Sequence, residues 1–517
     1  MKRFFSILLC TAMLAGLFSG CANPGGDSYT PTGDGLTVDK DYVGATEPDT
    51  QDEPQELSLT YYPDKSMNPY LCTDFTNRAL FSLLYQSLFI VDREYNVEPM
   101  LCKQFSVSAD MKTYVFYMEE ATFSNGTVLT PRDVAASLNA AKESDVYKGR
   151  FTHVNNITVS EDGGVVVSLS VPVEDLPLLL DIPILKESHV AMDRPLGTGP
   201  YVLDESGSSA VLRRRDNWWC APPMLITAGV ISLIKAEDNA QIRDSFEFSG
   251  LSLVCADPGS DKYADYRCDY ELWDCENNLF LYLACNMESE VFSNETLRSA
   301  LPTLVDRDAI VENFYRGFAR SASLPASPLS KCYNSTLASR YEYDGGAAFA
   351  KAVKDTAMTG MPIVLLVNSD DSLRLRVAKT IAQNLTDAGL AVTLSALSTN
   401  SYTAALRRGE YDLYLGQTKL SPNMDLTAFF SDSGALSYGD LDDVALYTMC
   451  TESLANYGNF YTLHQAVMND GRLCPILVRS YAVYAIRGLL TGLTPARENL
   501  FYYSLGKTMS KANISAQ

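Results

Sequence analysis

The chain has 517 residues, and its 63 Asp and Glu residues outnumber its 41 Lys and Arg residues, which gives a formal net charge of −22. So acidic a chain argues against nucleic acid as a partner, because phosphate contacts need clustered basic side chains. Hydrophobic residues make up 46% of the sequence, so the chain is long and apolar enough for two or three folded domains.

The first 20 residues predict a signal peptide. Lys2 and Arg3 form a short basic start, and the apolar run that follows, residues 4–18, is too short to span a bilayer comfortably. Small residues then stand directly before Cys21, an arrangement that resembles a bacterial lipoprotein signal. We therefore expect lipid on Cys21 and an extracytoplasmic protein anchored to the bacterial cell membrane. The alternative is an ordinary cleaved signal with an incidental cysteine.

A polar segment follows that cysteine. Residues 21–55 are rich in Gly, Pro, Thr, Asp and Glu and hold few large apolar side chains, so they cannot bury enough surface to fold. We expect a disordered tether here. Dense apolar patterning begins at about Leu57 and persists to about Leu505, and no apolar run in that stretch is long enough for a membrane span.

Local patterns predict the first folded elements. A helix is expected to begin near residue 130, because Thr130 suits the N-cap, Pro131 the first helical position and Asp133 the third. Strands are expected at residues 57–62 and 165–171, and two short helices at residues 295–317.

Residues 196–219, LGTGPYVLDESGSSAVLRRRDNWW, place two glycines around a threonine. A phosphate-binding loop needs a strand before its glycines and a helix after them, so that the helix N-terminus faces the anion. Here Gly199 is followed by PYVL, a Gly/Ser turn and AVLRRR, and the lysine of a P-loop is missing. The stretch therefore predicts a β-hairpin and argues against a phosphate site.

The middle of the chain alternates between two kinds of pattern. Runs at residues 363–368, 391–397 and 411–416 indicate strands, and the segments between them, 372–389 and 401–409, have helical spacing. This β–α–β–α–β order predicts a mostly parallel sheet covered by helices, which places the chain in the α/β class.

Neither a metal site nor a catalytic motif is apparent. The 12 cysteines include no Cys-x-x-Cys; most stand in apolar surroundings, although an exported chain could form a disulfide, and Cys268 with Cys275 is the closest pair in sequence. Gly-x-Ser-x-Gly and His-Glu-x-x-His do not occur. The three histidines, His153, His189 and His464, form no local motif. We therefore expect no metal, no cofactor and no enzymatic activity.

Five segments carry a further signal through their order along the chain. They are MNPYL at 67–71, FSVSADMKTYVFYMEEATFSNGTVLTPRDVAASL from Phe105, the GTGPY hairpin with its Asn217-Trp218-Trp219 ending, LYLACNMES with the helices that follow it up to Ala319, and CPILVRSYAVYAIRGLLTGLTP from Cys474. Together they resemble the extracytoplasmic solute-binding proteins of family 5, the peptide- and nickel-binding class that serves ABC importers. The resemblance spans residues 60–505, nearly the whole folded chain.

The resemblance implies a two-lobed, periplasmic-binding-protein-like fold of type II with an enlarged first lobe. The first lobe is expected from residues 56–282 plus 483–512, and the second from residues 283–480. The chain is expected to cross between the lobes near residues 283–286 and 478–482. Such a fold closes over a solute, because a ligand that contacts the closed state better than the open one shifts the equilibrium toward closure.

In peptide-binding relatives, a strand of the second lobe ends in Gly-Trp, and an Asp in the acidic loop after it holds the α-amine of the peptide. Here Gln417 follows Gly416 in place of the tryptophan, and Pro422 lies near the place of that Asp, which weakens the expectation of a free-amine peptide. The candidate ligand contacts are Tyr414, Gly416, Gln417, Thr418, Asp425, Asn286 and Trp273. The alternatives are helix capping for Asp425, backbone bracing for Asn286 and core packing for Trp273.

For function, the resemblance implies a receptor that delivers a peptide or similar small organic solute to an ABC transporter permease. We expect it to act as a monomer and to leave the solute chemically unchanged. One alternative is a sensor of solutes or peptide signals that works without a permease, and another is a lipoprotein hydrolase.

Overall fold

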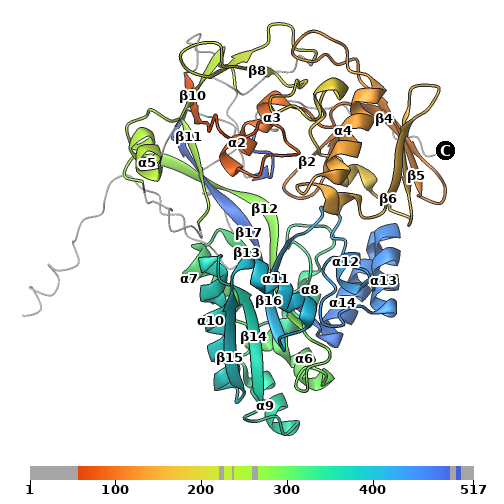
Figure 1. The fold of residues 1–517 in the computed structure, drawn as a ribbon, viewed down its shortest axis with the longest axis vertical. Helices are drawn as coiled ribbons and strands as arrows, with labels where there is room; N and C mark the ends of the chain where they lie inside the picture. The colour runs from red at the N-terminus through yellow and green to blue at the C-terminus, as the bar shows by residue number, and fades with distance from the viewer. Residues whose placement is uncertain (1–55, 221–225, 236–237, 259–265, 490–495, 502–517) are drawn as a thin grey trace, which may run out of the picture.

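A computed structural model describes residues 56–220, 226–235, 238–258, 266–489 and 496–501. The predicted signal peptide, Cys21 and the tether lie outside the described residues. Two lobes stand one above the other and share two long strands, β12 (Tyr270–Cys285) and β17 (Leu473–Ile486) (Figure 1). This arrangement is the two-lobed α/β fold that the sequence predicts, with the first lobe the larger of the two.

The first lobe contains the strands and helices before β12, together with a short strand near the C-terminal end of the described chain. Its strands are β1 (Leu57–Thr60), β2 (Phe89–Val91), β3 (Val97–Pro99), β4 (Cys102–Val107), β5 (Thr113–Met118), β6 (Val154–Val159), β7 (Val165–Leu169), β8 (Tyr201–Asp204), β9 (Val211–Arg214), β10 (Val230–Ile234), β11 (Leu253–Ala256) and β18 (Ala496–Arg497). Its helices are α2 (Phe75–Ala79), α3 (Phe81–Leu84), α4 (Pro131–Glu143) and α5 (Asn239–Glu247).

The second lobe contains the elements between β12 and β17. Its strands are β13 (Ala319–Ser321), β14 (Pro362–Asn368), β15 (Ala391–Leu397) and β16 (Leu413–Lys419). Its helices are α6 (Glu295–Ala300), α7 (Arg307–Tyr315), α8 (Ser335–Ala338), α9 (Ala347–Asp355), α10 (Ser372–Asp387), α11 (Thr399–Arg408), α12 (Thr427–Phe430), α13 (Val444–Ala455) and α14 (Phe460–Asp470). β14 pairs in parallel with both β15 and β16, which confirms the predicted βαβ order.

One twisted sheet runs through both lobes, in the order β15-β14-β16-β12-β17-β11-β1-β10-β9-β8. In the second lobe β12 pairs with β16, and in the first lobe β17 pairs with β11. Between these regions the β12–β17 register shifts from Glu276 to Phe280, and Asn278 has a φ of 58°. We propose that the chain crosses between the lobes at this irregular stretch, facing Val478 and Ser480, rather than at residues 283–286 near the end of β12.

The GTGPY stretch is a hairpin, as predicted, because β8 and β9 pair antiparallel directly after it. Its glycines have a packing role. The amide of Gly199 donates to the carbonyl oxygen of Leu84 at 3.0 Å, and a Cβ built on Gly199 would lie 2.5 Å from the carbonyl oxygen of Leu83. The backbone of this loop therefore packs directly on the backbone of α3, an approach that only glycine permits.

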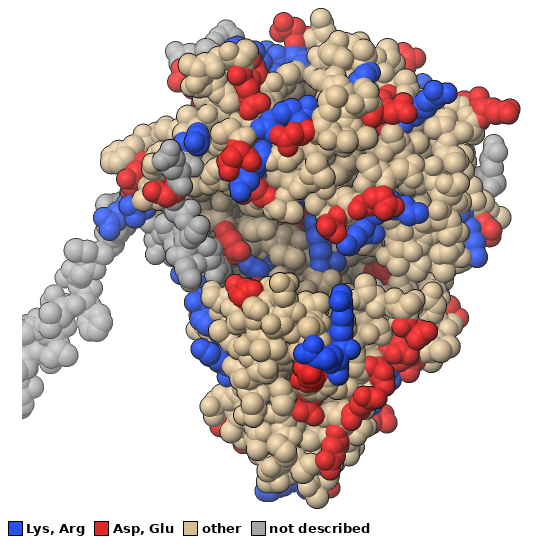
Figure 2. Space-filling view, in the orientation of Figure 1, with Lys and Arg blue, Asp and Glu red and all other residues tan. Residues whose placement is uncertain are grey.

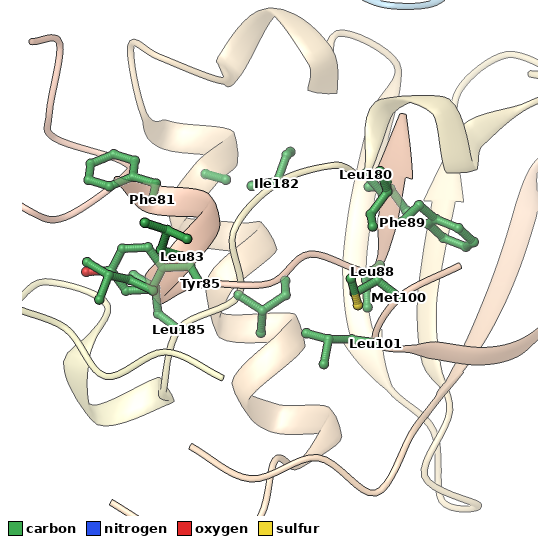
Figure 3. Packing of buried hydrophobic residues seen from close by; sticks show 14 of the residues in the cluster. Phe81, Leu83, Tyr85, Leu88, Phe89, Met100, Leu101, Leu180, Ile182 and Leu185 are labelled. Carbon is green, nitrogen blue, oxygen red and sulfur yellow. The ribbon is translucent and has the colours of Figure 1, made fainter. Parts of the chain in front are cut away.

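The core of the first lobe gathers side chains from segments far apart in sequence. Figure 3 shows apolar side chains of α3 and β2 beside those of residues 180–185 and of Met100 and Leu101. Helix α4 covers this core and begins as the sequence predicts, because the Thr130 and Asp133 side chains each accept a hydrogen bond from the backbone of the other residue. The same core includes side chains of β12 and β17, so the first lobe packs directly on the shared strands.

Candidate functional site

Strand β16 leads from the core of the second lobe to the junction between the lobes. Leu413 and Leu415 are fully buried in that core. Because side chains alternate along a strand, Gln417 and Lys419 continue on the same face. There the strand emerges from the core: Gln417 is half-buried, and the side chain of Lys419 is 35% exposed.

The opposite face of β16 carries the other three predicted residues of this strand. Tyr414 is buried, with its ring centre 5.8 Å from that of Tyr282. Gly416 lies against the same ring, and a Cβ there would stand 2.4 Å from the Tyr282 Cζ. Thr418 is half-buried opposite Phe280 on β12. Thus Tyr414 and Gly416 pack inside the lobe, whereas Gln417 and Thr418 reach partly accessible surface.

Arg479, on the shared strand β17, joins the two lobes. Its Nη2 donates to both carboxylate oxygens of Asp257, just after β11, at 2.8 Å. Its Nη1 donates to Oε1 of Gln417 at 3.2 Å, and its guanidinium lies 5.4 Å from the ring centre of Tyr315. Gln417 Nε2 has no hydrogen-bond partner among the described residues, which leaves it able to donate to a ligand.

An aromatic pair lies beside this arginine on the first-lobe side. Phe75, the first residue of α2, stacks on Tyr481 of β17 with ring centres 3.6 Å apart and planes 24° apart. Both side chains are half-buried. A partly exposed, stacked aromatic pair offers a flat apolar surface to an organic solute.

A buried ion network also joins the lobes. Asp181 pairs with Arg150 and with Arg497, whose Nη2 lies 2.5 Å from the Asp181 Oδ2. Glu498 in turn forms ion pairs with Arg150 at 2.9 Å and with Lys419 of the second lobe at 3.0 Å. Burial would raise the pKa of Glu498, but the surrounding cations hold it below its usual range.

Lys419 is the one member of this network that solvent reaches substantially. Its side chain is 35% exposed, whereas those of Arg150, Asp181, Arg497 and Glu498 are 7% exposed or less. Desolvation lowers the pKa of Lys419 to about 8, although the charge of Glu498 favours the protonated form. The Lys419 side chain is therefore the partly exposed end of an otherwise buried network.

Asp425 is held by two partners. Its Oδ1 accepts a hydrogen bond from the amide of Thr427, the first residue of α12, at 2.8 Å, and its Oδ2 lies 3.0 Å from His153 Nε2 of the first lobe. Burial would raise the pKa of Asp425, but the hydrogen bond and charge of His153 outweigh it, so the pKa lies below its usual value. This carboxylate thus supports the start of α12 and a contact between the lobes.

The two remaining predicted contacts lie away from the crevice surface. Asn286 is 5% exposed, and its Nδ2 donates to the carbonyl oxygens of Gly409 and Tyr411 at 3.2 and 2.8 Å. Trp273 is 4% exposed and belongs to the core of the first lobe. In the structure, therefore, Asn286 braces backbone and Trp273 packs in a core.

Metal-ligating side chains are dispersed. Within the described ranges, no group of three or more His, Cys, Asp or Glu residues is placed to hold a metal ion. His464 is fully buried, and desolvation lowers its pKa to about 3. The ten described cysteines are free thiols. No helix in the described part of the chain is long and apolar enough to cross a membrane.

Sequence reasoning missed several residues of this region: Phe75, His153, Asp257, Lys419 and Tyr481. Lys419 had a usable signal, since it stands two residues beyond Gln417 and so shares its strand face. His153 had none, because 272 residues separate it from Asp425.

Figure 2 shows that the surface is hollowed between the lobes, with acidic and basic side chains around the hollow.

Comparisons with known proteins agree with this architecture. The glutathione-binding protein GsiB of Escherichia coli is 23% identical over 355 residues, covering 66% of this chain and 69% of that protein. The ABC transporter substrate-binding protein CtaP of Listeria monocytogenes superposes with a TM-score of 0.70 at 17% identity, over 88% of this chain and 99% of that one.

The oligopeptide-binding protein AppA of Bacillus subtilis, solved with a nonapeptide, superposes with a TM-score of 0.62 at 17% identity, over 89% of this chain and the whole of the other. These structural likenesses concern the fold. The family of bacterial extracellular solute-binding proteins, family 5, matches residues 96–436, about two thirds of the sequence. The chain therefore belongs to the bacterial extracellular solute-binding proteins of family 5.

Proposed function

We propose that this protein is a lipid-anchored receptor that binds a peptide or similar small organic solute between its lobes and delivers it, unchanged, to an ABC transporter permease. One observation carries the proposal. Arg479, on a strand shared by both lobes, bonds to Asp257 of the first lobe and Gln417 of the second, beside the partly accessible Phe75–Tyr481 stack. A solute seated here touches both lobes and the strands that join them, so its binding couples directly to closure.

The relatives support the same broad solute class. GsiB is named for binding glutathione, and the AppA structure of Bacillus subtilis contains a nonapeptide. In this chain the nearby carboxylate of the loop after β16, Asp425, is occupied by His153 and by the amide of Thr427. We therefore propose that the loop after β16 does not bind a free α-amine of the solute.

Thermal unfolding of the mature protein tests the proposal. The protein is refolded to remove cargo and heated with peptides, amines, sugars and nickel, each supplied separately. A solute at 100 times its Kd stabilises the folded state by about 2.7 kcal/mol, which for roughly 450 folded residues raises Tm by about 3 °C. Mass spectrometry of the recovered solute distinguishes retention from turnover. If no class raises Tm, or if the solute is chemically altered, the receptor function is wrong.

Lipid anchoring has its own test. Replacing Cys21 with serine removes the thiol that would carry the lipid, so we expect Cys21→Ser protein to leave the membrane fraction and appear in the soluble extracytoplasmic fraction. Fractionation with immunoblotting measures this, and mass spectrometry of the wild-type N-terminus should show an acylated cysteine. A variant that stays with the membrane would show that another segment anchors the protein.

A further inference from the structure

The junction around Lys419 is cationic within a strongly acidic chain. Four cations lie there, Arg78, Arg150, Lys419 and Arg497, and the carboxylates that act on them are Asp181, Glu498 and Glu276. The cations at the junction therefore outnumber these carboxylates, whereas the whole chain carries a net charge of −22. Crevice walls of one sign concentrate solutes of the opposite sign, because low-dielectric surroundings focus the field.

Arg78 contributes to this excess because its direct partners are neutral. Its guanidinium donates to the carbonyl oxygens of Pro69 and Cys72, at 3.4 and 3.1 Å, and to the hydroxyl of Tyr147 at 3.4 Å. Among the described residues, no carboxylate forms an ion pair with it. Arg78 is half-buried, and the charge of Glu498 also acts on it. Because its guanidinium has no directly paired carboxylate, it would stabilise an anion that entered the junction.

Two of these cations are not fully buried: Arg78 is half-buried, and Lys419 is the more exposed of the two. Lys419 is 35% exposed, and its pKa of about 8 reflects desolvation together with repulsion from Arg78 and Arg150. Glu498 is the only acid paired with it among the described residues, and that carboxylate is already shared with Arg150 and Arg497. The ammonium group therefore retains the capacity to bind a further anion.

The neighbouring carboxylates do not offset the preference of Lys419 for an anionic group. Asp425, the only acid in residues 416–426, has an 8% exposed side chain and is held by His153. Asp257 is 37% exposed, but both of its oxygens accept hydrogen bonds from Arg479. Resting on the proposed solute-binding function, we propose that Lys419 anchors a carboxylate or other anionic group of the solute, so that the cargo is an anionic peptide or organic acid.

Calorimetry on the mature protein with matched peptides tests this. The probes are an acetylated tripeptide with a free carboxylate, the same peptide as its C-terminal amide, and an unacetylated amide that is cationic. We expect the anionic probe to bind at least 10-fold more tightly than the neutral one. The affinity for the anion should fall as pH rises from 7 to 9, because Lys419 loses its proton near its pKa of about 8.

Substitutions at Lys419 test whether this side chain binds the anion directly or only adds to the positive charge of the junction. Lys419→Met should weaken binding of the anionic probe at least 10-fold and leave binding of the neutral probe unchanged. Lys419→Arg should still bind the anionic probe, and its affinity should no longer depend on pH between 7 and 9. The control, Lys351→Met, removes an exposed lysine paired with Asp355 on α9 and should bind like the wild type. Circular dichroism and wild-type binding of the neutral probe would show that the variants fold, even where loss of the Lys419–Glu498 ion pair lowers Tm.

The outcomes also distinguish this inference from the proposed function. If neutral or cationic probes bind as well as the anionic one, or if Lys419→Met binds the anion normally, the anion site is wrong and the receptor function stands. If no probe of any charge binds and thermal unfolding finds no solute, both are wrong.

Discussion

Asp181→Asn is expected to lower the free energy of unfolding by about 3–5 kcal/mol, because it removes the carboxylate from a buried ion network. Asp181 is fully buried between Arg150 and Arg497, whose side chains are 5% and 0% exposed. Asparagine has nearly the same shape but carries no charge. The two arginines would then share Glu498, which already pairs with Lys419. Urea unfolding followed by circular dichroism measures the change.

The matched control is Asp204→Asn, which breaks an Arg–Asp pair of the same lobe at its surface. Arg213 and Asp204 are 59% and 27% exposed, and exposed pairs contribute about 0–1 kcal/mol. We therefore expect a much smaller change for Asp204→Asn. Similar losses for the two variants would contradict the view that burial, rather than pairing alone, gives the Asp181 network its weight.

The sequence predicted those parts of the fold that local patterns determine. The β–α–β–α–β order followed from apolar periodicity, and β14 does pair in parallel with β15 and β16. The start of α4 followed from Thr130, Pro131 and Asp133, since capping depends on neighbours within one turn. One difference is the end of β16: it continues to Lys419 instead of stopping at Gly416, because residues 417–419 keep pairing with β12.

The side-chain arrangement at the junction between the lobes was largely unpredictable. Arg150, Asp181, Lys419 and Arg497 come from four segments, and the pair that joins Arg150 to Glu498 spans 348 residues. Contacts of this kind leave no spacing in the sequence, because they depend on how both lobes fold around β12 and β17. Gln417 was found because a family resemblance pointed to β16. The same resemblance gave no warning that Tyr414 and Gly416 face the lobe interior.

Gly199→Ala is expected to destabilise the first lobe by about 3 kcal/mol, at the upper end of the cost of overpacking a well-packed site. The new Cβ would lie 2.5 Å from both the Leu83 carbonyl oxygen and the Leu84 carbonyl carbon. These are backbone atoms of α3, so no side chain can rotate away, and the hydrogen bond from Gly199 to Leu84 would stretch.

The control is Gly207→Ala in the turn of the same hairpin, where a Cβ meets nothing nearer than 3.6 Å. We expect a change within about 0.5 kcal/mol there. Chemical unfolding of both variants measures the difference, and equal stabilities would show that the glycines of GTGPY serve something other than close backbone packing.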